Sequence, residues 1–158
     1  MQDILTCAMG LDVHRDIIVA CLVKGAVDAE PEAETRTFST LIPEMQKLRD
    51  WVIESECRNI AMESTGIYWQ PIYEMLESCF DGEISILVVN ARHMKNVPGR
   101  KTDMKDAQWI ATLLRAGLLK GSFIPDKAFR ELRHLTRYRK GVVHDITAQK
   151  NRIDKFLQ

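Results

Sequence analysis

Residues 5–14, Leu-Thr-Cys-Ala-Met-Gly-Leu-Asp-Val-His, decide the fold that we expect for this chain. The run from Leu5 to Val13 is apolar almost throughout and is bounded by polar residues. Such a run is typical of a central strand that is buried on both faces. Asp12 lies inside it, where a carboxylate is costly unless it is paired or bound to metal. The stretch therefore predicts a buried strand with a candidate functional side chain near its carboxyl end.

Further strands and helices are expected on both sides of a sheet built around this strand. The apolar and β-branched runs predict strands over residues 17–23, 35–38, 59–63 and 84–89. The first expected helix is capped by Thr40 and has Pro43 in its first turn. A second helix is expected to begin at Pro71, and a third to run from Asp103 to Gly117. Three strands followed by helix, strand, helix and strand imply an α/β fold with a mixed sheet flanked by helices.

A last helical pattern follows Pro125 and runs to the end of the chain. Six of its eight seam positions are apolar, at the spacing of a coiled coil: Leu132, Leu135, Arg139, Val142, Ile146, Gln149, Ile153 and Phe156. Gly141 allows a kink. We therefore expect an α/β domain over residues 1–124 and the start of a helical coiled-coil segment over 125–158. The pattern stops without a cap, which suggests a fragment of a longer protein.

Charge is divided unevenly along the 158 residues, although the total is zero. Residues 1–90 hold 6 basic and 16 acidic side chains, a net of −10, and residues 91–158 hold 16 basic and 6 acidic ones, a net of +10. The second half is therefore expected to face a polyanion such as nucleic acid. The alternative is that the two halves neutralise each other by contact.

Composition and the chain start argue against a membrane or secreted protein. The chain is 46% hydrophobic and 28% charged, and no apolar run approaches the roughly 20 residues that span a bilayer. Met1 is followed by no basic segment of a signal peptide. The cysteines, Cys7, Cys21, Cys57 and Cys79, form no metal-binding spacing, so we expect reduced thiols in a cytoplasmic protein.

The polar stretch from Pro98 to Asp106 carries two carboxylates three residues apart, at Asp103 and Asp106. On a helix this spacing places both on one face, where they repel each other unless a cation lies between them. A hard divalent ion with oxygen ligands relieves that repulsion. The neighbouring Arg100, Lys101 and Lys105 favour a metal site that handles a phosphate backbone. The alternative is a first-turn cap with a solvated neighbour.

Glu63 ends the predicted strand over residues 59–63, much as Asp12 lies near the end of the first strand. Together with Asp103 and Asp106, these carboxylates form a candidate catalytic tetrad for Mg²⁺ (or Mn²⁺) in phosphodiester chemistry. Each residue also has a structural alternative: Glu63 as a turn cap, and Asp12 as a partner of a loop amide. We favour the metal site because all four would converge at one sheet edge.

Three segments together resemble the DEDD transposases of the IS110 insertion-sequence family. They are residues 10–14 (Gly-Leu-Asp-Val-His), 62–66 (Met-Glu-Ser-Thr-Gly) and 101–107 (Lys-Thr-Asp-Met-Lys-Asp-Ala). The resemblance spans nearly the whole chain, in order and with compatible spacing. It implies a RuvC-like domain of the ribonuclease-H-like fold, and it places the family's acidic tetrad on Asp12, Glu63, Asp103 and Asp106.

The resemblance also implies recombination guided by a bridge RNA, and a nucleophilic serine in a C-terminal domain that is absent from these residues. The expected partners are thus DNA, guide RNA and further copies of the chain, joined through the helical arm into a dimer or tetramer. The basic side chains that we expect to contact nucleic acid are Arg92, Lys95, Arg100, Lys101, Lys105, Arg130, Arg133, Arg137 and Lys140.

Other functions remain open at this point. The chain is alternatively a nucleic-acid-binding and oligomerisation module without chemistry of its own. A sugar-kinase or actin-like ATPase would need glycine-rich phosphate loops, and a proofreading exonuclease would need an acid where His14 stands. His14 is expected to be a hydrogen-bonded residue at a strand end. Among the aromatics after Gly66, burial is expected for Trp69, and stacking on an unpaired base is the alternative.

Overall fold

The computed structural model describes residues 4–64, 66–80, 82–90 and 106–157. The chain divides into two compact units, Met1–Ser122 and Phe123–Gln158. No helix within the described ranges is long and apolar enough to cross a bilayer. The residues predicted to open the helix after Pro98, including Asp103, lie outside these ranges.

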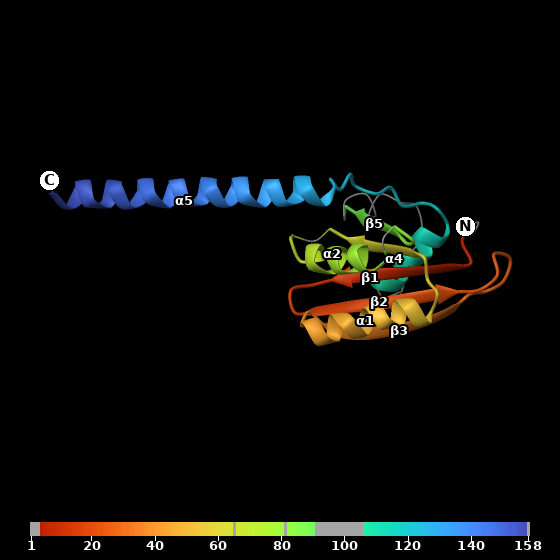
Figure 1. The fold of residues 1–158 in the computed structure, drawn as a ribbon. Coiled ribbons are helices and arrows are strands. Elements are labelled where there is room, and N and C mark those ends of the chain that lie inside the picture. Colours follow the sequence, from red (N-terminus) through yellow and green to blue (C-terminus); the bar gives the residue numbers. More distant parts are fainter. Residues whose placement is uncertain (1–3, 65, 81, 91–105, 158) are drawn as a thin grey trace. The chain divides into compact units, whose positions relative to one another are not determined.

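A five-stranded mixed sheet forms the centre of the first unit, in the order β3-β2-β1-β4-β5 (Figure 1). Its strands are β1 (Cys7–Val13), β2 (Ile17–Lys24), β3 (Glu32–Ser39), β4 (Asn59–Glu63) and β5 (Ser85–Val89). β1 pairs antiparallel with β2 and parallel with β4, and β4 pairs parallel with β5. The predicted central strand and mixed sheet are confirmed, and the carboxyl ends of β1, β4 and β5 lie at one edge.

Helix α1 (Ile42–Glu54) packs on one face of the sheet, and α2 (Trp69–Phe80) follows β4. The ring of Trp51 on α1 lies 6.1 Å from that of Phe38 on β3. Phe38 pairs with Ile18, which in turn pairs with Val13 of β1. Paired side chains point to the same face of a sheet, so α1 covers the face to which Val13 belongs.

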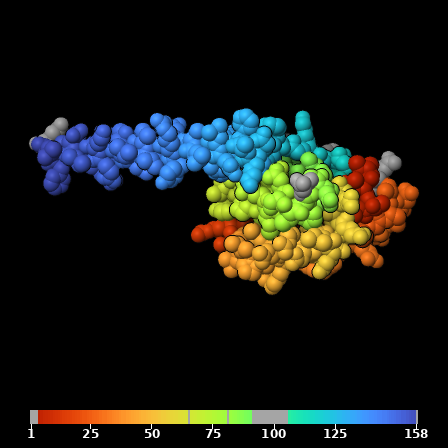
Figure 2. All heavy atoms as spheres, viewed as in Figure 1, coloured from red at the N-terminus to blue at the C-terminus, as the bar shows by residue number. Residues whose placement is uncertain are grey.

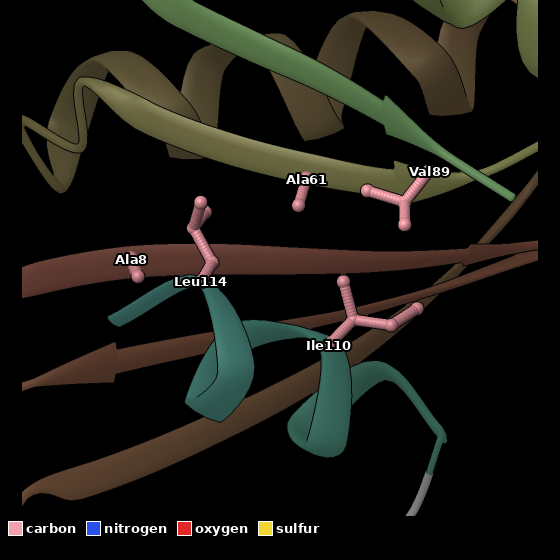
Figure 3. Close-up of a cluster of buried hydrophobic side chains, with 5 residues drawn as sticks. All are labelled: Ala8, Ala61, Val89, Ile110 and Leu114. Carbon is pink, nitrogen blue, oxygen red and sulfur yellow. The ribbon is translucent and has the colours of Figure 1, made fainter. Parts of the chain in front are cut away.

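Helix α4 (Asp106–Arg115) covers the opposite face. Ile110 and Leu114 pack in one buried cluster with residues of three strands: Ala8, Ala61 and Val89 (Figure 3). Ala107 and Ala111 form a second cluster with Cys21 and Val23 of β2. Alanines occur on both the helix and the strands of these clusters, so the helix backbone can lie close to the sheet.

Gly10 marks the closest approach between α4 and β1. A Cβ atom added there would lie 2.1 Å from the carbonyl oxygen of Ala107 and 2.5 Å from the amide nitrogen of Ala111. Both are backbone atoms, so no side-chain rotation could make room for it. Only glycine therefore permits α4 to occupy this position over the centre of the sheet.

Arg115, the last residue of α4, fixes the other end of the helix. Its side chain is charged but only 1% exposed. Its Nε donates to the Leu5 carbonyl at 2.9 Å. Its Nη2 donates to the carbonyls of Gly25 and Ala26 at 3.1 and 2.6 Å. A buried guanidinium is tolerated because these acceptors replace water. The residue ties α4 to the segment before β1 and to the loop after β2.

The second unit consists mainly of α5 (Lys127–Leu157). Asp126 caps its first turn, accepting a hydrogen bond at Oδ1 from the backbone N–H of Phe129 at 3.0 Å. The helix continues through Gly141. In Figure 2 its blue spheres form a rod one helix thick. Its apolar seam is exposed, for example 66% at Leu135 and 60% at Ile153.

Several predicted boundaries were wrong by a few residues. β3 begins at Glu32 rather than at residue 35, and α2 begins at Trp69 rather than at Pro71. Leu41, not Thr40, occupies the N-cap position of α1, and it makes no side-chain cap. The Thr40 hydroxyl instead donates to the Arg15 carbonyl at 3.0 Å, which joins the β1–β2 turn to the end of β3.

Replacing Gly10 with alanine should force α4 away from β1. We expect a loss of about 1–3 kcal/mol in the free energy of unfolding, the usual cost of overpacking a core. Urea unfolding followed by tryptophan fluorescence measures it, because Trp109 on α4 is 8% exposed and reports on that contact. Gly141→Ala is the control, since nothing lies within 4 Å of a Cβ there. Equal unfolding midpoints for Gly10→Ala and the unmodified chain would contradict the close approach.

Candidate active site at the carboxyl ends of β1 and β4

The register between β1 and β4 brings Asp12 beside Glu63. Leu11 is paired with Met62, so the next residue on each parallel strand is a carboxylate. Neighbouring strands are about 4.8 Å apart. Asp12 follows Gly10 by two residues, and Glu63 follows Ala61 by two, so both side chains emerge on the face covered by α4. The predicted convergence of these two acids is therefore present in the backbone.

Asp106 joins the same end of the sheet as the first residue of α4. The helix runs antiparallel to β1, because Leu114 and Ile110 share a cluster with Ala8 whereas Ala107 lies over Gly10. Its amino-terminal end is thus directed toward the end of β1 that carries Asp12. The side chain of Asp106 is exposed. The fourth predicted acid, Asp103, lies outside the described residues.

His14 makes the most specific contact to this group. Its Nε2 donates to Oδ2 of Asp12 at 3.1 Å, with the Asp12 side chain 13% exposed and that of His14 53% exposed. The backbone N–H of His14 donates to the Ile17 carbonyl at 2.9 Å, which closes the β1–β2 turn. His14 was expected to be hydrogen-bonded at a strand end, but sequence alone did not reveal that its partner is Asp12.

Backbone contacts fix the end of β4 as well. The N–H of Ser64, immediately after Glu63, donates to the Val89 carbonyl at 2.9 Å. Glu63 itself is partly buried and pairs with Val89 in the register of β4 with β5. The position of Glu63 is therefore set by two neighbouring strands, β1 and β5, rather than by a free loop.

The donor chemistry fits a hard divalent cation. Carboxylate oxygens are the ligands that Mg²⁺ and similar ions prefer, and Asp12 and Glu63 supply them from adjacent strands. Within the described ranges, however, no three His, Cys, Asp or Glu side chains gather closely enough to hold a metal ion.

A small hollow opens at this end of the sheet, with a volume of about 250 Å³. Arg15, Thr40, Ile67 and Tyr68 are among its lining residues. Tyr68 is 40% exposed, whereas Trp69 is 9% exposed and packs edge-to-face on Tyr73 at 5.7 Å. The expected burial of Trp69 is confirmed, and Tyr68 presents an accessible ring.

The basic residues predicted to contact nucleic acid fall into three groups. Arg133, Arg137 and Lys140 are exposed on α5. Arg130 is only 7% exposed, and its Nη1 donates to the Pro125 carbonyl at 2.7 Å. Its guanidinium therefore helps to fix the start of α5, and its contact with nucleic acid stays a prediction. The remaining five lie outside the described residues: Arg92, Lys95, Arg100, Lys101 and Lys105.

Comparison with known proteins agrees with this fold. Residues 9–158 match the model of the IS110 family of DEDD proteins, which is described as "Transposase". The search of curated proteins gave no match. The fold is similar to that of Thermus thermophilus RuvC, at 12% identity and a TM-score of 0.50, over 73% of this chain and 99% of that one. A structure of T. thermophilus RuvC with a Holliday junction substrate gives the same identity and TM-score over 75% and 100%.

Proposed function

The chain belongs to the IS110 family of DEDD transposases, and on that premise we propose that residues 1–124 are a catalytic domain for DNA strand cleavage and exchange. Asp12, Glu63, Asp103 and Asp106 are assigned as its acidic tetrad, with Mg²⁺ or Mn²⁺ as the cofactor. The observation that carries this assignment is the β1–β4 register, which sets Asp12 beside Glu63 on the face covered by α4.

Each acidic side chain has a proposed role in binding the cation. Asp12 and Glu63 would supply carboxylate ligands from two adjacent strands, and Asp103 and Asp106 would complete the set of ligands. His14 orients the Asp12 carboxylate through the bond to Oδ2 and so acts as a positioning residue. When bound, the metal would activate an attacking oxygen and stabilise the leaving oxygen of a phosphodiester.

Nucleic acid is the proposed partner of the basic surfaces. Helix α5 carries nine Lys and Arg against three Asp and Glu, a net charge of +6. Arg133, Arg137 and Lys140 are exposed there and are suited to phosphate contacts. Tyr68 and Arg15 line a hollow at the same end of the sheet, and this hollow suits stacking on an unpaired base. We propose that these surfaces take DNA and a guide RNA.

The exposed seam of α5 supports self-association through the helical arm. A row of large apolar side chains along one helix is unfavourable in water and is normally covered by a partner helix. Leu135, Ile146 and Ile153 are all at least half exposed. A second copy of the same helix offers a complementary seam, and an assembly of two or four copies is the proposed state.

The second candidate function is a module that binds nucleic acid and oligomerises without chemistry of its own. The basic charge and the exposed apolar seam of α5 favour it. The two functions differ in one respect: only the catalytic assignment makes recombination depend on the tetrad.

Asp12→Asn and Asp103→Asn, each in the full-length transposase, should abolish excision and insertion in a plasmid recombination assay. Asparagine keeps the size and the acceptor for His14 but removes the charge that holds a cation. Circular dichroism should show an unchanged fold. Asp16→Asn is the matched control, because Asp16 is an exposed carboxylate on the β1–β2 turn, four residues from Asp12. Recombination by the two variants at the rate of this control would refute the tetrad.

Replacing Arg133, Arg137 and Lys140 together with glutamine should weaken binding to DNA and flatten its salt dependence. The slope of log K against log salt is negative, and each lost phosphate contact reduces its magnitude by about 1. Fluorescence anisotropy between low and moderate salt measures this slope. Lys47→Gln on α1 removes an exposed cation from the acidic half and serves as control. A slope equal to that of the unmodified chain would exclude this face of α5 from the binding surface.

A further inference from the structure

Two cysteines that are fifty positions apart meet at the end of the sheet away from the carboxylates. Cys7 is the first residue of β1, and Cys57 lies two residues before β4. Met9 pairs with Ile60, so the register continued backward sets Cys7 next to the segment that begins at Cys57. The two thiols lie close enough together for each to change the pKa of the other.

Asn59 fixes the backbone around both thiols. Its side-chain Nδ2 donates to the Cys7 carbonyl at 3.4 Å. Its own carbonyl accepts from the Cys57 thiol at 3.3 Å. Asn59 thus holds the backbone of Cys7 and the thiol of Cys57 near each other.

The surroundings make the two thiols unequal. The neighbouring Cys57 side chain lowers the pKa of Cys7 to about 7. Burial opposes this shift, and the charge of Lys24, which pairs with Cys7 on β2, assists it. The neighbouring Cys7 side chain, together with burial, raises the pKa of Cys57. Near neutral pH, Cys7 is therefore the thiol that loses its proton more readily.

Both sulfurs lie where a small reagent can arrive. Cys7 is partly exposed, whereas Cys57 is 1% exposed. Cys57 nevertheless lines a hollow of about 360 Å³, together with Val52, Phe80 and Ile84. A partly exposed thiolate beside a protected thiol is the arrangement of a nucleophilic and a resolving cysteine.

We propose that Cys7 and Cys57 are an oxidisable dithiol that peroxide converts into a disulfide between β1 and the segment before β4. The Cys7 thiolate attacks one peroxide oxygen, the O–O bond breaks and hydroxide leaves, giving a sulfenic acid. The Cys57 sulfur then attacks the Cys7 sulfur, and the S–O bond breaks with loss of water. In sum, two thiols and one hydrogen peroxide give one disulfide and two waters, with two electrons passing from sulfur to oxygen.

The bond would join the two strands that carry Asp12 and Glu63 without reaching either acid. Asp12 is five residues further along β1 than Cys7, about 16 Å at the rise of a strand. Oxidation should therefore constrain the unfolded chain and stabilise the sheet while the carboxylates keep their places. This inference stands independently of the proposed catalytic role.

Mass spectrometry of the chain after treatment with hydrogen peroxide tests the proposal. We expect the loss of two hydrogen atoms, a peptide pair linking Cys7 to Cys57, and a rise in the thermal midpoint that dithiothreitol reverses. Cys7→Ser and Cys57→Ser should each abolish the link and the rise. Cys79→Ser is the matched control, because Cys79 is exposed on α2, and this variant should behave as the unmodified chain.

Trapping with dimedone distinguishes the two steps. In Cys57→Ser, the sulfenic acid on Cys7 should persist and be captured, whereas in the unmodified chain it should be consumed by the link. A stable sulfenic acid on Cys7 with Cys57 present would overturn the proposal. So would a link that involves Cys79 or that joins two chains.

Discussion

The contact between the backbone of α4 and Gly10 is the constraint on which the candidate site depends. With a carbonyl oxygen 2.1 Å from where a Cβ would stand, the helix lies directly on the central strand. That placement brings the amino-terminal end of α4 to the end of β1, and with it Asp106. Arg115 holds the opposite end of the helix through three backbone carbonyls. The helix is therefore fixed at both ends, and its first residue is directed toward Asp12.

β1 and β4 form the rigid frame between two chemically different ends. At their carboxyl ends Asp12 and Glu63 share a face, which favours a cation. At their amino ends two thiols lie close together, and Asn59 is hydrogen-bonded to both residues. Parallel pairing accounts for both, since residues far apart in sequence are matched in order along the two strands. The same register thus determines the geometry of the acids and that of the sulfurs.

Much of this arrangement follows from sequence pattern, and some of it does not. The apolar run around Asp12 identified the central strand, and the position of Glu63 at a strand end placed it beside Asp12. The role of Gly10 could not be predicted from the sequence, because a close approach between the backbones of a helix and a strand leaves no periodic pattern of residues. Arg115 was missed for a similar reason: a cation in the last turn of a helix ordinarily faces solvent, and its acceptors come from distant loops. The burial of Arg130 was also not predicted, because a basic helix pattern does not distinguish an exposed guanidinium from one that bonds the preceding loop.

A crystal of the chain soaked in Mn²⁺, with anomalous scattering used to locate the ion, tests the central claim most directly. The account predicts a manganese peak bound by oxygens of Asp12 and Glu63, with further ligands from Asp103 or Asp106, at the roughly 2 Å distances of small hard cations. Manganese bound elsewhere, with Asp12 and Glu63 free of metal, would contradict the assignment of this sheet edge as a catalytic centre.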